Sequence, residues 1–236
     1  MKVLGIETSG IIGGVAVCKD RNTVITRDFG TGMQHDKELV PTIKAVFQEI
    51  GWTLSDIDLI SVDVGPGSYT GLRIGVTCAK VLAYALKKPV IGVPIFDIIA
   101  ENYTMNSTPI CPVIDARRNH VYACIYNPNL TSNEQTGKST KWKKQSEFLV
   151  IKPVELLNML PRPVIVFGDG VTNYKNIFQQ KDIFIDKEEM AMPKPEYVAL
   201  LGEMMYSSGQ RCKMEELAPL YLRQAEAIEK FEKEKG

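Results

Sequence analysis

The sequence has little of what metal sites and hydrolytic sites are usually built from. Its 236 residues include only two histidines, His35 and His120, which lie far apart in the chain. Neither has a second histidine at the short spacing that places two metal ligands on one face of a helix. No Gly-x-Ser-x-Gly segment marks a serine nucleophile. A histidine-based metal site and a serine hydrolase are therefore not predicted.

The sequence also lacks an excess of charge of either sign. It has 28 basic and 28 acidic side chains, giving a formal net charge of zero. A protein that binds nucleic acid unaided usually clusters Lys and Arg to neutralise several phosphates. Lys141, Lys143 and Lys144 around Trp142 form a small basic group, which a solvated loop or strand edge explains more readily. We therefore do not expect nucleic-acid binding by this chain alone.

Cysteine pairs and long apolar runs are missing too. The five cysteines are odd in number and include no Cys-x-x-Cys pair, so neither a disulfide framework nor a zinc framework is predicted. No apolar run approaches the roughly 20 residues that span a bilayer. An acid at position 7 argues against a signal peptide. We expect a cytoplasmic protein with free thiols and no membrane association.

Hydrophobic patterns over the first hundred residues predict the order β-β-β-α-β-α-β. The predicted strands cover residues 3–6, 15–18, 23–29, 57–64 and 90–93. Short turns join the first three, which indicates an antiparallel meander, and helical patterns separate the later ones. This order is that of one half of the actin-like, sugar-kinase-like ATPase fold, an α/β architecture.

A polar stretch after residue 104 suggests a domain boundary. It divides the chain into an N-terminal subdomain, 1–104, and a C-terminal subdomain, 105–236, whose last helices can pack back on the first. In the second part we expect paired strands over residues 111–115 and 121–126, an exposed loop or hairpin over 127–144, a strand over 164–167 and a helix over 197–207.

The first predicted helix contains a proline. Leu39, Ile43 and Val46 recur at helical spacing, and Gly51 stands where a C-terminal cap belongs. Pro41 interrupts the pattern, because proline inside a helix removes a hydrogen bond and clashes with the preceding turn. It predicts either an early kink or a helix start later than Asp36.

The glycine-rich turn Gly-Pro-Gly-Ser-Tyr-Thr-Gly over residues 65–71 carries the strongest signal. Gly65 and Gly67 permit close approach of the backbone, and Ser68 or Thr70 can cap a helix predicted over residues 71–87. A helix N-terminus suits a phosphate. The same residues equally make a tight structural turn with a good cap, since this is neither a Rossmann nor a Walker fingerprint.

Small residues recur every four positions along that helix, at Gly71, Gly75, Ala79 and Ala83. Each glycine costs about 1 kcal/mol of helix propensity, so the stripe indicates that another backbone approaches closely. That backbone can belong to the chain's own sheet or to another subunit. The sequence leaves these alternatives equal.

Glu7 ends the first predicted strand. In actin-like ATPases an acid there can help to hold a metal–phosphate, although a lone acid at a strand end is more often merely solvated. Asp115-Ala116-Arg117-Arg118 follows a later strand and could bind an anion. Surface ion pairs are the commoner outcome for such arginines.

Along nearly its full length the chain resembles the TsaB/YeaZ family. The most specific match is Gly-Pro-Gly-Ser-Tyr-Thr-Gly-Leu-Arg-Ile-Gly over residues 65–75. The supporting matches are residues 5–9, His35-x-x-Glu38-Leu39, Ala79-Lys80, residues 115–118 and Pro219-x-Tyr221-Leu222-Arg223. The resemblance implies an actin-like ATPase fold with two α/β subdomains. Glu7 stands where the family often has Asp, and residues 127–144 match no family pattern.

The resemblance implies a scaffold subunit and not a catalyst. Family members pair with the catalytic subunit TsaD, and the ATPase TsaE docks on the pair. Together they transfer threonylcarbamoyl from its adenylate to an adenosine beside the anticodon of tRNA. This sequence lacks the His-x-x-x-His metal motif of TsaD. A homodimer is also implied, and tRNA would be reached only through the complex.

Two sets of site residues are predicted, and none of them is catalytic. The helices of the first subdomain make the TsaD and homodimer contacts in the family, and this maps an interface onto Leu39, Ile43, Gly71, Leu72, Arg73, Gly75, Val76, Ala79 and Ala83. The candidate nucleotide-binding residues are Glu7, Gly65, Gly67, Ser68 and Thr70. We expect no tightly bound cofactor, with ATP or ADP and Mg²⁺ at a subunit interface as the alternative.

The sequence leaves two alternative functions to be weighed. The first is a stand-alone actin-like ATPase or phosphotransferase that uses Glu7 and the glycine-rich turn. The second is a peptidase, a label once given to related families. The sequence offers no nucleophile–base–orienter set and no cluster of metal ligands, which disfavours the peptidase.

Overall fold

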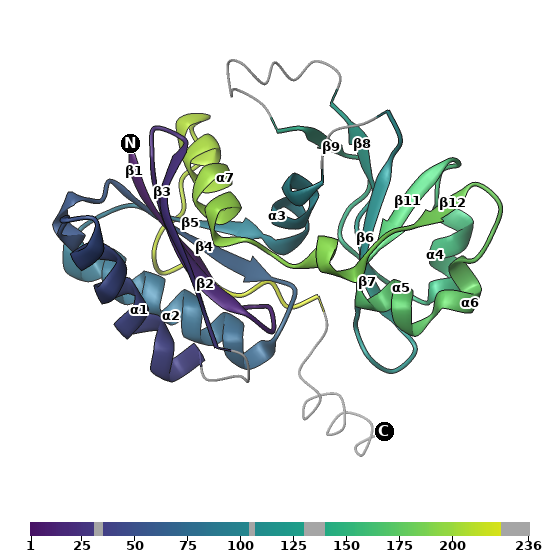
Figure 1. The fold of residues 1–236 in the computed structure, drawn as a ribbon, viewed down its shortest axis with the longest axis horizontal. Coiled ribbons are helices and arrows are strands. Elements are labelled where there is room, and N and C mark those ends of the chain that lie inside the picture. Colours follow the sequence, from purple (N-terminus) through teal and green to yellow (C-terminus); the bar gives the residue numbers. More distant parts are fainter. Residues whose placement is uncertain (31–34, 104–106, 130–139, 223–236) are drawn as a thin grey trace.

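The chain folds into two sheets, each with its own helices (Figure 1). A computed structural model describes residues 1–30, 35–103, 107–129 and 140–222. The middle of the predicted loop over 127–144, and Arg223 of the C-terminal motif, lie outside these ranges. The predicted α/β fold is confirmed. No helix in the described ranges has the length and apolar character needed to cross a bilayer.

The first sheet has five strands in the order β3-β2-β1-β4-β5. They are β1 (Lys2–Glu7), β2 (Gly13–Lys19), β3 (Asn22–Phe29), β4 (Leu59–Gly65) and β5 (Val90–Pro94). The first three are antiparallel neighbours, whereas β4 runs parallel to β1 and β5 parallel to β4. The predicted meander and the predicted order of elements are confirmed.

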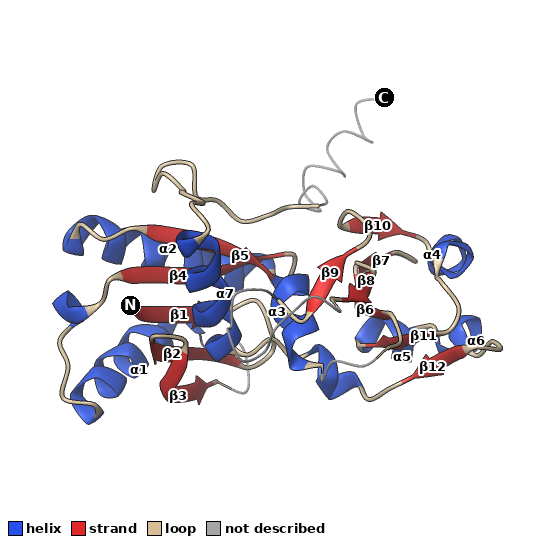
Figure 2. Cartoon of the chain, turned by 90° about the horizontal axis from the view of Figure 1, so that it is seen from above, coloured by secondary structure: helices blue, strands red, loops and turns tan. Residues whose placement is uncertain are grey.

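Helices cover both faces of this sheet (Figure 2). They are α1 (His35–Glu49) and α2 (Tyr69–Leu86) on one face, and α3 (Ile95–Asn102) and α7 (Pro195–Ser207) on the other, with a short 3-10 turn η1 (Leu54–Asp56) before β4. Leu4 of β1 packs under α1 and α2, while Val3 packs against Val198 of α7. Gly5 lets α7 approach, because a Cβ there would lie 2.5 Å from the carbonyl oxygen of Pro195.

Helix α1 begins at His35 and includes Pro41, so the predicted alternative of a start later than Asp36 is wrong. The proline side chain is exposed, while Leu39 and Ile43 are buried in the core. Burying such apolar side chains stabilises by about 1.5–3 kcal/mol each. Together they offset the roughly 3 kcal/mol cost of an interior proline.

The second sheet has seven strands. They are β6 (Ile110–Asp115), β7 (Val121–Ala123), β8 (Tyr126–Pro128), β9 (Trp142–Lys144), β10 (Leu149–Ile151), β11 (Val164–Phe167) and β12 (Ile183–Ile185). Their order is β10-β7-β6-β11-β12, with β8 pairing with both β6 and β9. Its short helices and turn are α4 (Pro153–Met159), α5 (Asp169–Asn173), α6 (Lys175–Phe178) and η2 (Glu188–Ala191). The predicted pairing of strands after residue 110 is confirmed as β6–β7, and the structure shows that the pair is antiparallel.

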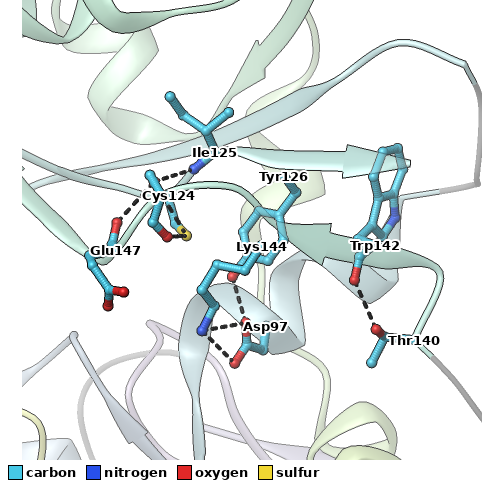
Figure 3. Close-up of polar contacts among 9 residues, drawn as sticks. Asp97, Cys124, Ile125, Tyr126, Thr140, Trp142, Lys144 and Glu147 are labelled. Atoms are coloured by element: carbon cyan, nitrogen blue, oxygen red, sulfur yellow. Dashed lines mark hydrogen bonds and ion pairs between the residues drawn. The ribbon is translucent and has the colours of Figure 1, made fainter. Parts of the chain in front are cut away.

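The two sheets meet where α3 packs on strands β8 and β9 (Figure 3). Phe96 of α3 shares an apolar cluster with Tyr126 and Trp142. The Tyr126 hydroxyl donates a 2.6 Å hydrogen bond to Asp97, and the Lys144 ammonium lies 3.1 Å from the same carboxylate. Burial and the Asp97 charge raise the pKa of Tyr126, so its hydroxyl remains a donor. The predicted basic group is thus a strand edge fixed to α3.

Candidate functional site

The glycine-rich turn joins β4 to α2 and packs on the end of β1. The side chain of Ser68 caps α2 by accepting a 3.2 Å hydrogen bond from the Gly71 amide. The Ser68 amide donates to the carbonyl oxygen of Ser9 at 3.0 Å. Gly67 lies against Ser9 so closely that a Cβ would meet the Ser9 Cβ at 2.7 Å. The Gly71 amide is therefore already bonded to Ser68, whereas a phosphate at this helix end would need such an amide as a donor.

The small-residue stripe of α2 faces the chain's own sheet. A Cβ on Gly71 would lie 1.9 Å from the carbonyl oxygen of Thr8, and one on Gly75 would lie 2.2 Å from the Thr8 hydroxyl. Ala79 and Ala83 are also buried. Of the two alternatives for this stripe, the structure shows close packing on the chain's own sheet, because Gly71 and Gly75 leave room for Thr8 at the end of β1.

Nearly all of the predicted interface residues are core residues. The buried ones are Leu39, Ile43, Gly71, Leu72, Gly75, Val76, Ala79 and Ala83. Arg73 alone among the predicted set is exposed, and its guanidinium lies 4.0 Å over the ring of Tyr69. An amphipathic helix turns its apolar stripe to its own core, so a partner would meet the opposite face. The outward residues of α2 include Tyr69, Arg73, Thr77, Val81 and Tyr84.

Glu7 is not solvated, because it forms a buried pair with Asp63 at the ends of the neighbouring strands β1 and β4. Both side chains have no exposed surface. The Ser9 hydroxyl lies 2.8 Å from Glu7 Oε1 and also contacts Asp63 Oδ2. The amides of Ser9 and Gly10 donate to Glu7 Oε1 at 2.6 and 3.0 Å, and the Gly65 amide donates to Asp63 at 2.7 Å. Within the described residues, Glu7 Oε2 has no hydrogen-bond partner.

Burial raises the pKa of both carboxyls. The pKa of Glu7 rises from 4.5 to about 8, first through burial and second through the charge of Asp63. Burial raises the pKa of Asp63 from 3.8 to about 6, against the opposing effect of hydrogen bonds from Ser9 and Gly65. At neutral pH this pair is therefore not fully ionised.

Asp63 was not among the site residues predicted from the sequence. A signal for it was present, since Ser61 and Asp63 alternate with the apolar residues of β4. In an α/β sheet with helices on both faces, the second face of a strand is buried as well. A carboxylate at such a position is expected to be buried and to need a partner.

A cleft of about 620 Å³ opens between the two sheets beside this turn. Ser9, Gly67 and Ser68 line it from the first sheet, and Asp115 and Arg117 line it from the second. The Arg117 guanidinium lies 3.3 Å from the Asp115 carboxylate, which is the predicted ion pair. Carboxylates outnumber cations in the lining: Asp28, Asp115, Asp169, Glu188 and Glu196 against Arg117 and Lys194.

The candidate nucleotide-binding residues do not converge on a metal–phosphate site. Gly67 and Ser68 line the cleft, whereas Gly65 is buried and Thr70 is exposed without lining it. Glu7 is fully buried and contacts the Ser9 hydroxyl. In the part of the chain that the structure describes, no group of three or more His, Cys, Asp or Glu is arranged to hold a metal. Because Glu7 has no exposed surface, a Mg²⁺–phosphate group in the cleft does not reach its carboxylate in this arrangement.

A sequence model of the family described as "TsaD: tRNA N6-adenosine threonylcarbamoyltransferase" matches residues 31–231. The chain belongs to the TsaD family. It is 28% identical to the Bacillus subtilis (strain 168) "tRNA threonylcarbamoyladenosine biosynthesis protein TsaB" over 236 residues, covering 98% of both chains. The Escherichia coli (strain K12) protein of the same name is 26% identical with the same coverage.

A solved structure described as "YeaZ from Pseudomonas aeruginosa" shares the fold. It superposes with a TM-score of 0.78 at 23% identity and covers 94% of this chain and 99% of that one. Together with the two TsaB relatives, this match confirms the resemblance to the TsaB/YeaZ family that the sequence motifs indicated.

Proposed function

We propose that this chain is a non-catalytic scaffold or activator subunit of the complex that forms threonylcarbamoyladenosine in tRNA. The observation that carries the proposal is the match over 98% of the chain to proteins named for this pathway. The chain lacks the His-x-x-x-His motif expected of the catalytic subunit. The buried acid pair supports the same role, since Glu7 is not free to bind a metal ion.

The proposed partner is TsaD, with TsaE docking on the pair. The outward faces of α1 and α2 are the proposed contact, because they expose apolar side chains to solvent. Val40 is 62% exposed, Val81 60% and Tyr84 75%. Exposed apolar side chains gathered on one face are a common mark of a protein interface. A homodimer could use the same face, and a cytoplasmic location with tRNA bound only through the complex completes the proposal.

To test this proposal, the chain would be mixed with a purified TsaD protein, and formation of a heterodimer would be measured by sedimentation. We expect a heterodimer with the native chain and its loss in the Tyr84→Asp and Val81→Asp variants, because a buried unpaired carboxylate is costly at an interface. Phe184→Asp is the matched control, since Phe184 is 56% exposed but lies on β12 of the second sheet. If the Tyr84→Asp and Val81→Asp variants form the heterodimer as well as Phe184→Asp does, α2 is not part of the contact.

The alternative is a stand-alone ATPase or phosphotransferase, and the cleft is the observation that favours it. Its volume of about 620 Å³ lies in the usual range of small-molecule sites. Calorimetry of the isolated chain with ATP and Mg²⁺ separates the two functions. Tight binding, with hydrolysis that Glu7→Ala abolishes, would support the enzyme.

A further inference from the structure

The Ser9 hydroxyl faces two carboxylates but has one hydrogen to donate. It lies 2.8 Å from Glu7 Oε1 and in hydrogen-bond contact with Asp63 Oδ2. Glu7 Oε1 already accepts the amides of Ser9 and Gly10, so the hydroxyl hydrogen is needed more by Asp63. Two ionised carboxylates so close together in the interior would repel each other.

Glu7 Oε2 is the buried oxygen that these contacts leave unsatisfied. As part of an ionised carboxylate it can only accept a hydrogen bond, and none of the described groups donates one. As part of a carboxylic acid it becomes a donor, and Asp63 is then the acceptor. A hydrogen bond from Glu7 is one of the effects that hold down the pKa of Asp63.

The described part of the chain brings no cation into an ion pair with Glu7 or Asp63. The charged groups of the neighbouring elements contact other partners. Asp97 of α3 pairs with Lys144, and His35 of α1 contacts the carbonyl of Gly10. Lys194 and Glu196, at the start of α7, line the cleft. On β2, the residue opposite Glu7 is Gly14.

We propose that Glu7 and Asp63 share one proton, held on Glu7 Oε2. This proton, and not a bound metal ion, neutralises one of the two negative charges at the ends of β1 and β4. The raised pKa of Glu7, about 8, agrees with a carboxyl that stays protonated at neutral pH. The proton ties the two strand ends together beneath Ser9. A metal ion could bind there only by displacing the proton and opening the turn.

Infrared spectroscopy of the isolated full chain tests the proposal without any partner. We expect a protonated-carboxyl C=O band at pH 7 that titrates away with a midpoint near pH 8. The band should be missing from Glu7→Gln and retained in Glu196→Gln, a control on a carboxylate that lines the cleft. Absence of the band from the native chain at pH 7, or its persistence in a folded Glu7→Gln variant, would overturn the proposal.

A second measurement separates a proton from a metal ion. Addition of millimolar Mg²⁺ at pH 7 is expected to leave the band of the native chain unchanged. Loss of the band on adding Mg²⁺ would show that the pair is a metal site, which contradicts the proposal. This comparison needs only the native chain, so it stands even if Glu7→Gln fails to fold.

Discussion

The hydroxyl of Thr8 donates a 2.8 Å hydrogen bond to the carbonyl oxygen of Gly71, so the end of β1 touches the first turn of α2. This contact is buried. It fixes which face of α2 points inward, and hence which residues the helix offers to a partner. The proposed contact surface and the buried acid pair thus depend on the same few residues around Thr8.

Substitution of Gly71 by alanine should destabilise the isolated chain. The added Cβ would lie 1.9 Å from the Thr8 carbonyl oxygen, so the backbone of α2 or β1 has to move. Overpacking of this kind costs about 1–3 kcal/mol, of which the better helix propensity of alanine returns up to about 1 kcal/mol. Urea unfolding measures the net loss in the free energy of unfolding.

The control for this substitution is Thr77→Ala, on the exposed face of the same helix. An exposed substitution there should change the free energy of unfolding by less than about 0.5 kcal/mol. If Gly71→Ala were as neutral as Thr77→Ala, α2 would lie farther from β1 than the structure places it.

The stability of the chain should fall as the pH rises through the window from about 4.5 to about 8. Glu7 has an ordinary pKa of 4.5 when unfolded and about 8 when folded, so between these values the folded chain binds more protons. The free energy of unfolding then decreases with increasing pH. Glu7→Gln should weaken this dependence, because the amide can donate to Asp63 as the protonated acid does. Denaturant unfolding at several pH values gives both slopes, and parallel curves for the native chain and the variant would count against the buried proton.

The contact between α3 and β8–β9 should depend more on Asp97 than on Lys144. Asp97→Ala leaves the buried Tyr126 hydroxyl without its acceptor, and an unsatisfied buried group costs about 1–3 kcal/mol. Lys144→Met removes only a partly exposed ion pair, worth about 1 kcal/mol or less. Thermal unfolding of the two variants ranks them. Equal losses would show that the ion pair, and not the tyrosine hydrogen bond, holds this contact.

The order of elements was predictable because each depends on local patterns. The apolar run of β1, the alternation in later strands and the 3.6-residue spacing in α1 are properties of short segments, and tertiary packing reinforced them. Pro41 was the exception. Its local cost was known, but the compensating burial of Leu39 and Ile43 depends on strands elsewhere in the chain.

The site was harder to predict, because it depends on residues distant in the sequence. Gly71 and Gly75 show only that something packs closely on α2, and Thr8, which does so, lies 63 residues before Gly71. Asp63 is buried because α7, more than a hundred residues later, covers its face of the sheet. The alternation of Ser61 and Asp63 with apolar residues shows which face of β4 they share, but it does not show that α7 covers that face.

Reconstituted tRNA modification tests the central claim most directly. Purified TsaD and TsaE, the threonylcarbamoyl adenylate and unmodified tRNA would be incubated with and without this chain, and threonylcarbamoyladenosine would be quantified by mass spectrometry. We predict efficient modification only when this chain is present, and we predict that the Glu7→Gln variant retains that effect. Full modification in its absence would contradict the proposed role as a required subunit.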